Sequence, residues 1–299
     1  MGRRRQGRGS RDAGARALPP GPRSRAEALV PAEALAFALA AAVIHASWNV
    51  LLAGARDVEA ATAVALPVSA LAVAPVAAVW WDLHASAWPF VAASSALELV
   101  YFALLATAYR RAELSVVYPL ARGFAPVLVL LGAVVFTAAT TSTRQVVGVL
   151  LVAAGILFVR GVRRGRGAGF GLAIAIVIAA YTVVDKHGVQ HAAPLAYLEL
   201  VTAFMGFAYF AGFVAIRGAR PLRAAWGWRP VAAGLASFAA YGLVLAALQL
   251  ASAASVAAVR ETGVLFATAL GAVVLKENVT RWRLAGAVLV VGGTALLSL

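Results

Sequence analysis

Apolar runs long enough to cross a lipid bilayer as a helix, about 20 residues each, recur from Ala34 to the C-terminus with short polar connections between them. An α-helix rises about 1.5 Å per residue, so each run matches the roughly 30 Å hydrocarbon core of a membrane. We predict ten spans, at residues 34–53, 61–81, 89–108, 114–136, 145–160, 168–187, 194–216, 230–250, 253–275 and 282–299. The pattern therefore predicts an all-α polytopic membrane protein with ten transmembrane helices.

The composition agrees with this prediction and excludes several kinds of chemistry. Of the 299 residues, 63% are hydrophobic and 13% are charged, whereas soluble domains average about 45–50% and about 25%. The chain has no cysteine, which excludes disulfides, thiolate metal sites and cysteine nucleophiles. No soluble domain interrupts the spans, so any activity must take place within the membrane or at its face.

An arginine-rich connection, 160-RGVRRGRG-167, divides the ten spans into two halves of five. The two halves resemble each other in sequence. The segment 132-GAVVFTAATTSTR-144 aligns with 271-GAVVLKENVTRWR-283, and 148-GVLLVAAG-155 aligns with 286-GAVLVVGG-293. The aligned glycines and arginines favour an internal duplication over chance similarity between apolar segments.

A duplicated unit of five spans has a consequence for orientation, because five is an odd number. The two halves must enter the membrane in opposite directions, which is the inverted-repeat arrangement of secondary transporters, with a site near the midplane where the halves meet. We predict a first repeat at residues 33–161 and a second at residues 168–299.

The segment before the first span, residues 1–32, carries eight arginines and no aromatic residue. Its Gly, Pro, Ser and Arg content predicts a disordered tail. Without aromatic side chains for bases to stack on, nucleic-acid binding is not expected. The long charged region and the full-length span that follows do not fit a signal peptide. An alternative interpretation is that translation begins near Val30.

Charges in the connections give conflicting orientations. Loops after odd-numbered spans hold fourteen Lys and Arg residues, whereas loops after even-numbered spans hold two, Arg144 and Lys186. The positive-inside rule then places the odd loops in the cytoplasm and both termini outside. The arginine-rich tail favours the opposite orientation.

Two arginines lie inside predicted spans. Arg122 is in 114-LSVVYPLARGFAPVLVLLGAVVF-136, and Arg260 is in 253-AASVAAVRETGVLFATALGAVVL-275. A charge at this depth is costly and usually faces the protein interior or a water-filled cavity. Two guanidinium groups in a central cavity would favour an anionic or zwitterionic substrate. Because the halves are inverted, we expect both arginines to reach the same central region.

An alternative is that these arginines are paired permanently with Glu98, Glu199 or Glu261 and only fix the helix packing. Adjacent helical residues diverge by about 100°, so Arg260 and Glu261 cannot both point the same way. At least one of the two should therefore face across the cavity.

Further polar and aromatic residues share helical faces that fit a cavity lining. His45, Trp48 and Asn49 follow an i, i+3, i+4 spacing, and Glu98 shares a face with Tyr101. The predicted substrate-binding residues are Trp48, Asn49, Tyr101, Tyr118, Arg122, Tyr181, Tyr241, Arg260 and Glu261.

Three titratable residues within predicted spans, His45, Glu98 and Glu261, are candidates for proton coupling, because a histidine or an intramembrane carboxylate can bind a proton during transport. A hydrogen-bonded packing role is the alternative for His45. Pro119 removes a backbone hydrogen bond beside Gly123, so the pair is a predicted helix hinge.

Other residues are assigned to structure. The charged residues Asp185, Lys186 and Glu199 lie near span ends, where interfacial solvation and snorkelling are expected. Glycines seven residues apart form small-residue stripes that let helices approach closely, and these are Gly148 with Gly155 and Gly286 with Gly293.

The chain resembles EamA-type members of the drug/metabolite transporter superfamily over residues 34–299. The resemblance rests on the order and spacing of five segments, 45-HASWN-49, 115-SVVYPLARGFAP-126, 181-YTVVDKHGV-189, 260-RETGVLFA-267 and 275-LKENVTRWRLAGAVLVVGG-293. It implies a ten-helix inverted-repeat protein that moves small metabolites, often outward, by alternating access. It also implies cytoplasmic termini, against the loop charges.

The expected function is a secondary transporter, with export favoured, of small polar metabolites or amino-acid-like compounds across the cell (plasma) membrane. The chain has no P-loop, no His-Glu-x-x-His motif and no nucleophile set, so we expect no enzymatic activity, no cofactor and no metal. Expected partners are a small-molecule substrate and the lipid bilayer, without nucleic acid, for a monomer or homodimer. Alternatives are a membrane-embedded enzyme and a non-transporting scaffold.

Overall fold

The computed structural model describes residues 30–53, 55–112, 114–137, 139–161, 167–266 and 280–298. The predicted tail up to residue 29 and the part of the predicted ninth span beyond residue 266 lie outside these residues. Within the described ranges the secondary structure is helical, apart from a single β-bridge between Leu83 and Ala192.

Each predicted span overlaps a described helix. The long helices are α2 (Ala32–Ala53), α3 (Val58–Val79), α4 (Trp88–Arg111), α5 (Leu114–Thr137), α6 (Thr143–Arg160), α7 (Ala168–Gly188), α8 (Pro194–Arg217), α10 (Trp228–Leu250) and α13 (Arg281–Ser298). The shorter ones are η1 (Ala85–Ala87), α9 (Arg220–Ala225) and α11 (Ala253–Arg260). By length and apolarity, α3, α4, α5, α7, α8 and α10 contain segments that can cross a membrane.

Local sequence signals set several of these helix boundaries. The Asp57 carboxylate caps α3 by accepting the Ala60 N–H at 3.0 Å, and the Ser142 hydroxyl caps α6 by accepting the Gln145 N–H at 3.1 Å. Helix α8 begins at Pro194, whose missing N–H costs nothing in the first turn. It ends before Gly218, whose φ of 75° suits a residue without a β-carbon.

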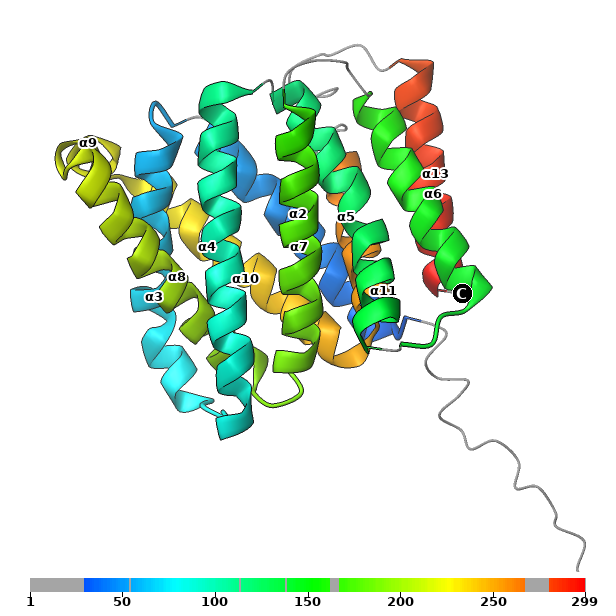
Figure 1. Ribbon diagram of the computed structural model, residues 1–299, viewed down its shortest axis with the longest axis horizontal. Helices are drawn as coiled ribbons and strands as arrows, with labels where there is room; N and C mark the ends of the chain where they lie inside the picture. Colours follow the sequence, from blue (N-terminus) through cyan, green and yellow to red (C-terminus); the bar gives the residue numbers. More distant parts are fainter. Residues whose placement is uncertain are drawn as a thin grey trace, which may run out of the picture.

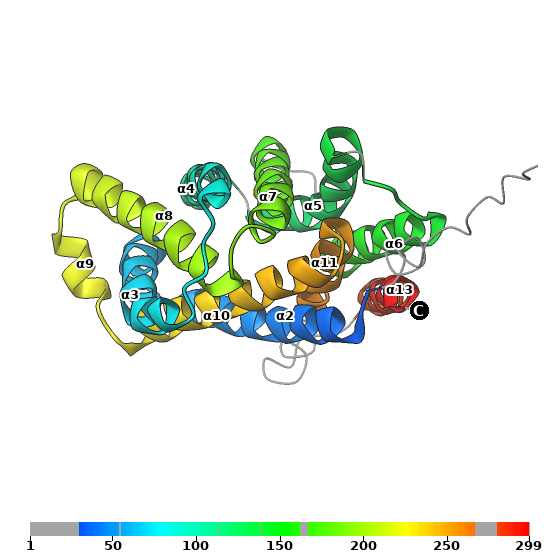
Figure 2. The ribbon, with the colours of Figure 1, turned by 90° about the horizontal axis from the view of Figure 1, so that it is seen from below.

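The helices form two facing rows (Figures 1 and 2). One row consists of α8, α4, α7, α5 and α6, and the other of α3, α10, α2, α11 and α13, with neighbours in each row packed together. Across the rows, α3 packs on α8 at one end, while α5 packs on α11 and α6 on α13 at the other. In the middle, α10 packs on α7 and α8, and α11 packs on α7.

The predicted ninth span is not one continuous helix. Helix α11 ends at Arg260, residues 261–262 form a turn, and residues 263–266 are helical again. By contrast, α5 runs without interruption through Pro119 and Pro126. The predicted span at residues 253–275 is thus interrupted at a charged pair, whereas the two prolines of α5 lie within an intact helix.

Helices α6 and α13 cross at the predicted glycine stripes. A β-carbon added to Gly155 would lie 2.7 Å from the Gly286 carbonyl oxygen, and one added to Gly293 would lie 2.7 Å from the Gly148 carbonyl oxygen. These distances leave no room for a methyl group, which confirms the packing role of the glycines. Since the lower number in α6 faces the higher number in α13, the two helices cross antiparallel.

The two ends of the helix bundle are held differently. One end, which we call the sealed end, joins residues 80–87 to residues 189–193. The His84 N–H donates to the His191 carbonyl at 3.0 Å, and the Ala193 N–H donates to the Asp82 carbonyl at 2.8 Å. The opposite end carries Arg56, and we call it the arginine end; side-chain ion pairs join its helices. The connection between α8 and α10 lies there and contains the short helix α9.

Candidate functional site

A cavity of about 660 Å³, its mouth included, lies between the two rows. Eight helices contribute to its lining, and α6 and α13 do not. Polar and aromatic side chains are concentrated in it. Those lining residues are His45, Trp48, Ser69, Glu98, Tyr101, Phe102, Arg122, Tyr181, Thr202, Ser237, Phe238, Tyr241 and Arg260.

Arg122 of α5 is buried in this cavity and held by two partners. Its Nη1 donates to the Glu261 Oε1 at 3.0 Å, and its Nη2 lies 2.5 Å from the His45 Nε2. The side chains of Arg122 and Glu261 are 8% and 7% exposed. A pair this deep is held by direct contact and is only weakly screened by salt.

Arg260 also lines the cavity but is held more loosely. Its Nη2 lies 3.7 Å from the Glu261 Oε1, beyond hydrogen-bond distance. Its Nε is buried and has no hydrogen-bond partner among the described residues. Glu261 therefore serves mainly as the partner of Arg122, and Arg260 keeps a donor that no group in the described part of the chain satisfies.

His45 is placed between two groups that only donate hydrogen bonds. The Trp48 Nε1–H points at its Nδ1 at 3.2 Å, and the Arg122 guanidinium points at its Nε2. A neutral imidazole has one acceptor nitrogen and a protonated one has none. A protonated His45 would therefore face both donors with N–H groups, so this arrangement favours a neutral ring that accepts from one of them.

Three tyrosines form an aromatic wall beside Glu98. The Tyr181 ring meets the Tyr101 ring edge-on at 6.2 Å and the Tyr241 ring edge-on at 6.0 Å between centroids. The Glu98 residue is 8% exposed, and none of the described residues forms a hydrogen bond with its carboxylate. Within the described ranges, the cavity thus offers one unsatisfied guanidinium nitrogen and one unpaired carboxylate between aromatic faces.

The structure brings most of the predicted site residues together. Of the eleven candidates, eight line the cavity, namely His45, Trp48, Glu98, Tyr101, Arg122, Tyr181, Tyr241 and Arg260. Glu261 lies behind them on Arg122, and the side chains of Asn49 and Tyr118 lie outside the described part of the chain. Their roles in binding substrate or protons stay predictions.

The predicted hinge in α5 is also placed. Pro119 and Gly123 are buried. A β-carbon on Gly123 would come within 2.8 Å of the Leu157 side chain of α6, so this glycine allows close packing of α5 on α6. A hinge function for the pair stays a prediction.

Asp185 is a site residue that the sequence reasoning missed. Its assignment to a solvated span end was wrong, because the residue is 0% exposed and accepts hydrogen bonds from the hydroxyls of Tyr197 and Tyr241. Tyr241 in turn lines the cavity. The signal was available, since Asp185 follows the cavity candidate Tyr181 by four residues and so shares its helical face.

The other two residues assigned to span ends are also partly or fully buried. The Lys186 ammonium donates to the Leu248 carbonyl at 2.6 Å. Glu199 is 7% exposed, and its Oε2 has no partner among the described residues. Neither residue lines the cavity.

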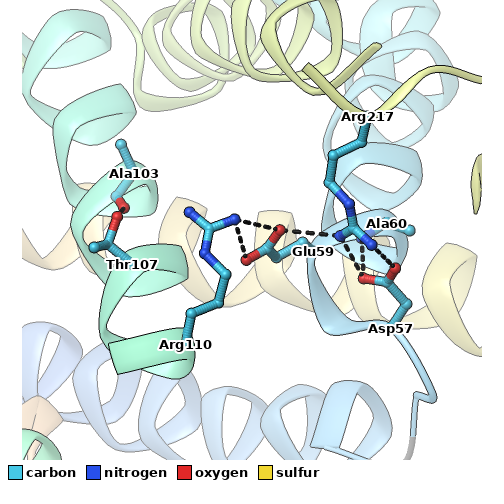
Figure 3. A network of polar contacts seen from close by, with 7 residues as sticks. All are labelled: Asp57, Glu59, Ala60, Ala103, Thr107, Arg110 and Arg217. Carbon is cyan, nitrogen blue, oxygen red and sulfur yellow. Dashed lines mark hydrogen bonds and ion pairs between the residues drawn. The ribbon is translucent and has the colours of Figure 1, made fainter. Parts of the chain in front are cut away.

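The arginine end carries a separate ion cluster (Figure 3). Arg217 of α8 binds Asp57 through both oxygens, at 2.8 and 3.2 Å, and reaches Glu59 at 3.0 Å. Glu59 also accepts from Arg110 of α4 at 3.2 Å. The cluster borders a second, open cavity of about 860 Å³, and it ties the start of α3 to the ends of α4 and α8.

The titration of Asp57 reflects this cluster. Partial burial raises its pKa, but the Ala60 N–H and the Arg217 guanidinium together lower it by more. The net effect is a pKa below the ordinary value for an aspartate.

Comparisons with known proteins place the chain in a class. Residues 165–299 match the family model described as the EamA-like transporter family, which confirms the resemblance to EamA-type transporters. The described helices and this match, which covers the second part of the chain, support a multi-pass membrane protein.

Among the solved structures that match the chain, one is similar over nearly its whole length. It is described only as "Crystal structure of protein", and it superposes with a TM-score of 0.74 over 89% of this chain and 98% of that chain. The two sequences are 16% identical, so the likeness concerns the fold alone. No curated protein matches the chain in a sequence comparison.

Proposed function

We propose that the protein is a secondary transporter that exports small polar metabolites or amino-acid-like compounds across the plasma membrane by alternating access. The observation that carries this proposal is the cavity between the two rows, with Arg122 from one row and Arg260 from the other. A charged side chain within the membrane that lines a cavity and has an unsatisfied hydrogen-bond donor is suited to bind a polar ligand.

The proposal includes ten spans in two inverted repeats. In this proposal each helix of the first repeat has a counterpart in the second, and α2, α3, α4, α5 and α6 correspond to α7, α8, α10, α11 and α13. A contact between two helices should then also be found between their two counterparts. Helix α10 packs on α2 as α4 packs on α7, and α11 packs on α2 as α5 packs on α7. The corresponding helices α6 and α13 cross antiparallel, which supports opposite orientations of the halves.

The chemistry of the lining supports a zwitterionic or anionic substrate. A substrate carboxylate would satisfy the free Nε of Arg260. An ammonium group would find the Glu98 carboxylate, and the tyrosine wall would cover an apolar part of the molecule. The alternative of an enzyme is less well supported, since His45 and Glu261 are already engaged with indole or guanidinium groups.

Alternating access requires that the two ends open in turn. At the sealed end, main-chain hydrogen bonds join two loops, and at the arginine end, side-chain ion pairs join the helices. If the positive-inside rule holds, the arginine end faces the cytoplasm. Breaking its ion pairs would then admit a substrate for export.

The test is an untargeted comparison of internal and external metabolites in cells with the protein, without it, and with Arg260→Ala. We expect a small set of polar compounds to accumulate outside only in cells with the unaltered protein. Arg223→Ala is the matched control, because this exposed arginine of α9 forms no ion pair with the described residues and does not line the cavity, so export should be unchanged. Equal metabolite profiles in all strains would contradict the proposal.

A further inference from the structure

Asp185 is the most deeply buried of the acidic residues that the structure describes, at 0% exposure. It lies on α7 one turn before the helix ends at Gly188. Its Oδ1 accepts from the Tyr197 hydroxyl of α8 at 2.9 Å, and its Oδ2 accepts from the Tyr241 hydroxyl of α10. One carboxyl group therefore connects three helices.

No cation lies within ion-pair distance of this carboxyl among the described residues. The charged groups that act on it are Glu98 of α4, which repels its negative charge, and Arg260 of α11, which attracts it. The neighbouring Lys186 ammonium is bound to the Leu248 carbonyl instead. A buried carboxylate without a cation is costly, and binding a proton removes that cost.

The position of Asp185 is as informative as its burial. On one side, Tyr241 separates it from the cavity. On the other side, the Tyr197 hydroxyl also lies 3.2 Å from the carbonyl of Phe90, whose ring stacks on His191 at the sealed end. A carboxyl in this position can exchange a proton with the cavity when the Tyr241 phenol moves. It can exchange a proton with the sealed end when the Tyr197 phenol moves.

The tyrosine next to the sealed end can switch partners. A phenol has a single hydrogen to donate, so Tyr197 donates either to Asp185 or to the Phe90 carbonyl. An ionised Asp185 favours the first arrangement, and a protonated one releases Tyr197 to the second. Protonation would thereby change a contact that ties α8 to the segment behind the seal.

We propose that Asp185 is a proton-binding site that couples a proton gradient to transport, with Tyr241 on the cavity side and Tyr197 on the sealed side. This inference rests on the proposed transport function. The step is the association of one proton with the carboxylate and its later release on the other side, so no co-reactant is needed.

The geometry favours Asp185 over the candidates named from the sequence. Glu261 is held by the guanidinium groups of Arg122 and Arg260, and a protonated His45 would oppose two donors. Glu98 lines the cavity and interacts with Asp185 electrostatically, so it is the competitor that an experiment must separate.

The first test needs no substrate. Infrared difference spectra of the full-length protein in lipid vesicles, taken between acid and alkaline pH, record the C=O stretch of protonated carboxyl groups. We expect a band that disappears in Asp185→Asn and persists in Glu98→Gln. Glu199→Gln is the matched control for a buried carboxyl outside the cavity. A band unchanged in Asp185→Asn, or lost only in Glu98→Gln, would overturn the assignment.

A second variant keeps the carboxyl and alters its surroundings. Gly188 leaves the space that the Tyr197 ring occupies, because a β-carbon there would overlap the ring. Gly188→Ala, checked for folding by thermal unfolding, should displace Tyr197 and shift the pH at which the band titrates. Gly212→Ala, where a β-carbon meets open space, should leave that pH unchanged. Equal titration in both variants would count against a role for Tyr197.

The transport arm uses vesicles loaded with a radiolabelled amino-acid mixture as the probe. Asp185→Asn should lower proton-gradient-driven movement at least tenfold while gradient-independent exchange persists. Movement that follows a sodium gradient, or equal driven movement in Asp185→Asn, would refute proton coupling here. If the unaltered protein moves none of the label, the transport function fails for this probe class, and the infrared result still decides the proton site.

Discussion

The molecule contains two clusters of arginines and carboxylates that differ in depth and in balance. In the cavity, Arg122, Glu261 and Arg260 have side chains that are 5–8% exposed. At the arginine end, the cluster formed by Asp57, Glu59, Arg110 and Arg217 is 14–57% exposed. The same functional groups thus meet at similar distances in two different dielectric environments.

The count of charges separates the two clusters further. The exposed cluster has two arginines for two carboxylates, and every one of the four groups has a partner. The buried cluster has two arginines for one carboxylate, and within the described residues it leaves the Nε of Arg260 unsatisfied. The exposed cluster is therefore complete as it stands, whereas the buried cluster has capacity for an additional negative group.

The largest expected effect comes from removing a member of the buried cluster. Arg260→Ala or Glu261→Ala should abolish transport, because the first removes the free donor and the second leaves two buried guanidinium groups without a counter-charge. Membrane insertion, followed by fractionation and immunoblotting, should be unchanged. Normal export by both variants would show that the cluster has no part in transport.

Two variants that each neutralise one carboxylate compare the contribution of the two clusters to stability. Glu261→Gln should lower the free energy of unfolding by about 3–5 kcal/mol, the range for breaking a buried ion pair. Glu59→Gln should cost at most about 1 kcal/mol, because its arginine partners are rehydrated. Unfolding in mixed detergent micelles measures both. Equal losses would mean that burial does not distinguish the clusters.

Salt should act on one cluster and spare the other. At about 1 M salt the Debye length falls to about 3 Å, so the destabilisation caused by Arg217→Ala should shrink relative to low salt. The destabilisation caused by Arg122→Ala should keep its low-salt value. Thermal unfolding of the purified variants at two salt concentrations checks this, and a common salt response would contradict the assigned difference in depth.

The smallest expected effect concerns pH at the arginine end. The folded-state pKa of Asp57 lies below its unfolded value, so its contribution to stability is complete above the unfolded pKa of about 3.9. It is lost as the pH falls through the folded pKa. Below pH 4 the unaltered protein should lose slightly more stability than Asp57→Asn, by less than about 1 kcal/mol. Parallel losses would exclude this contribution.

Much of the fold could be predicted from hydropathy, because each span must satisfy its own backbone within the membrane. The predicted span 168–187 and helix α7 (Ala168–Gly188) nearly coincide. The break after Arg260 was not predictable in this way. Its sequence, Arg-Glu-Thr, contains no proline, and the break coincides with the contact between Glu261 and Arg122, which are more than 130 residues apart in the chain.

The sequence predicted most residues of the site, but it did not predict which of them form pairs. The arginines, tyrosines and Glu98 stood out because polar groups are rare within spans. The partner of Arg122 was left open among three glutamates, and packing of α5 on α11 selects Glu261. Asp185 was predicted to be solvated because it lies near the end of its own span. Its burial comes from Tyr197 and Tyr241, which belong to other helices.

The crossing of α6 and α13 has a further meaning for how the chain is assembled. Gly155 faces Gly286, and Gly148 faces Gly293, so the contact has the same form when viewed from either helix. Such self-complementary surfaces are the isologous contacts that hold two-fold symmetric dimers together. Under the proposed inverted repeat, this single polypeptide would contain the interface of a dimer, and the two proposed halves, produced as separate chains, would each carry one side of that contact.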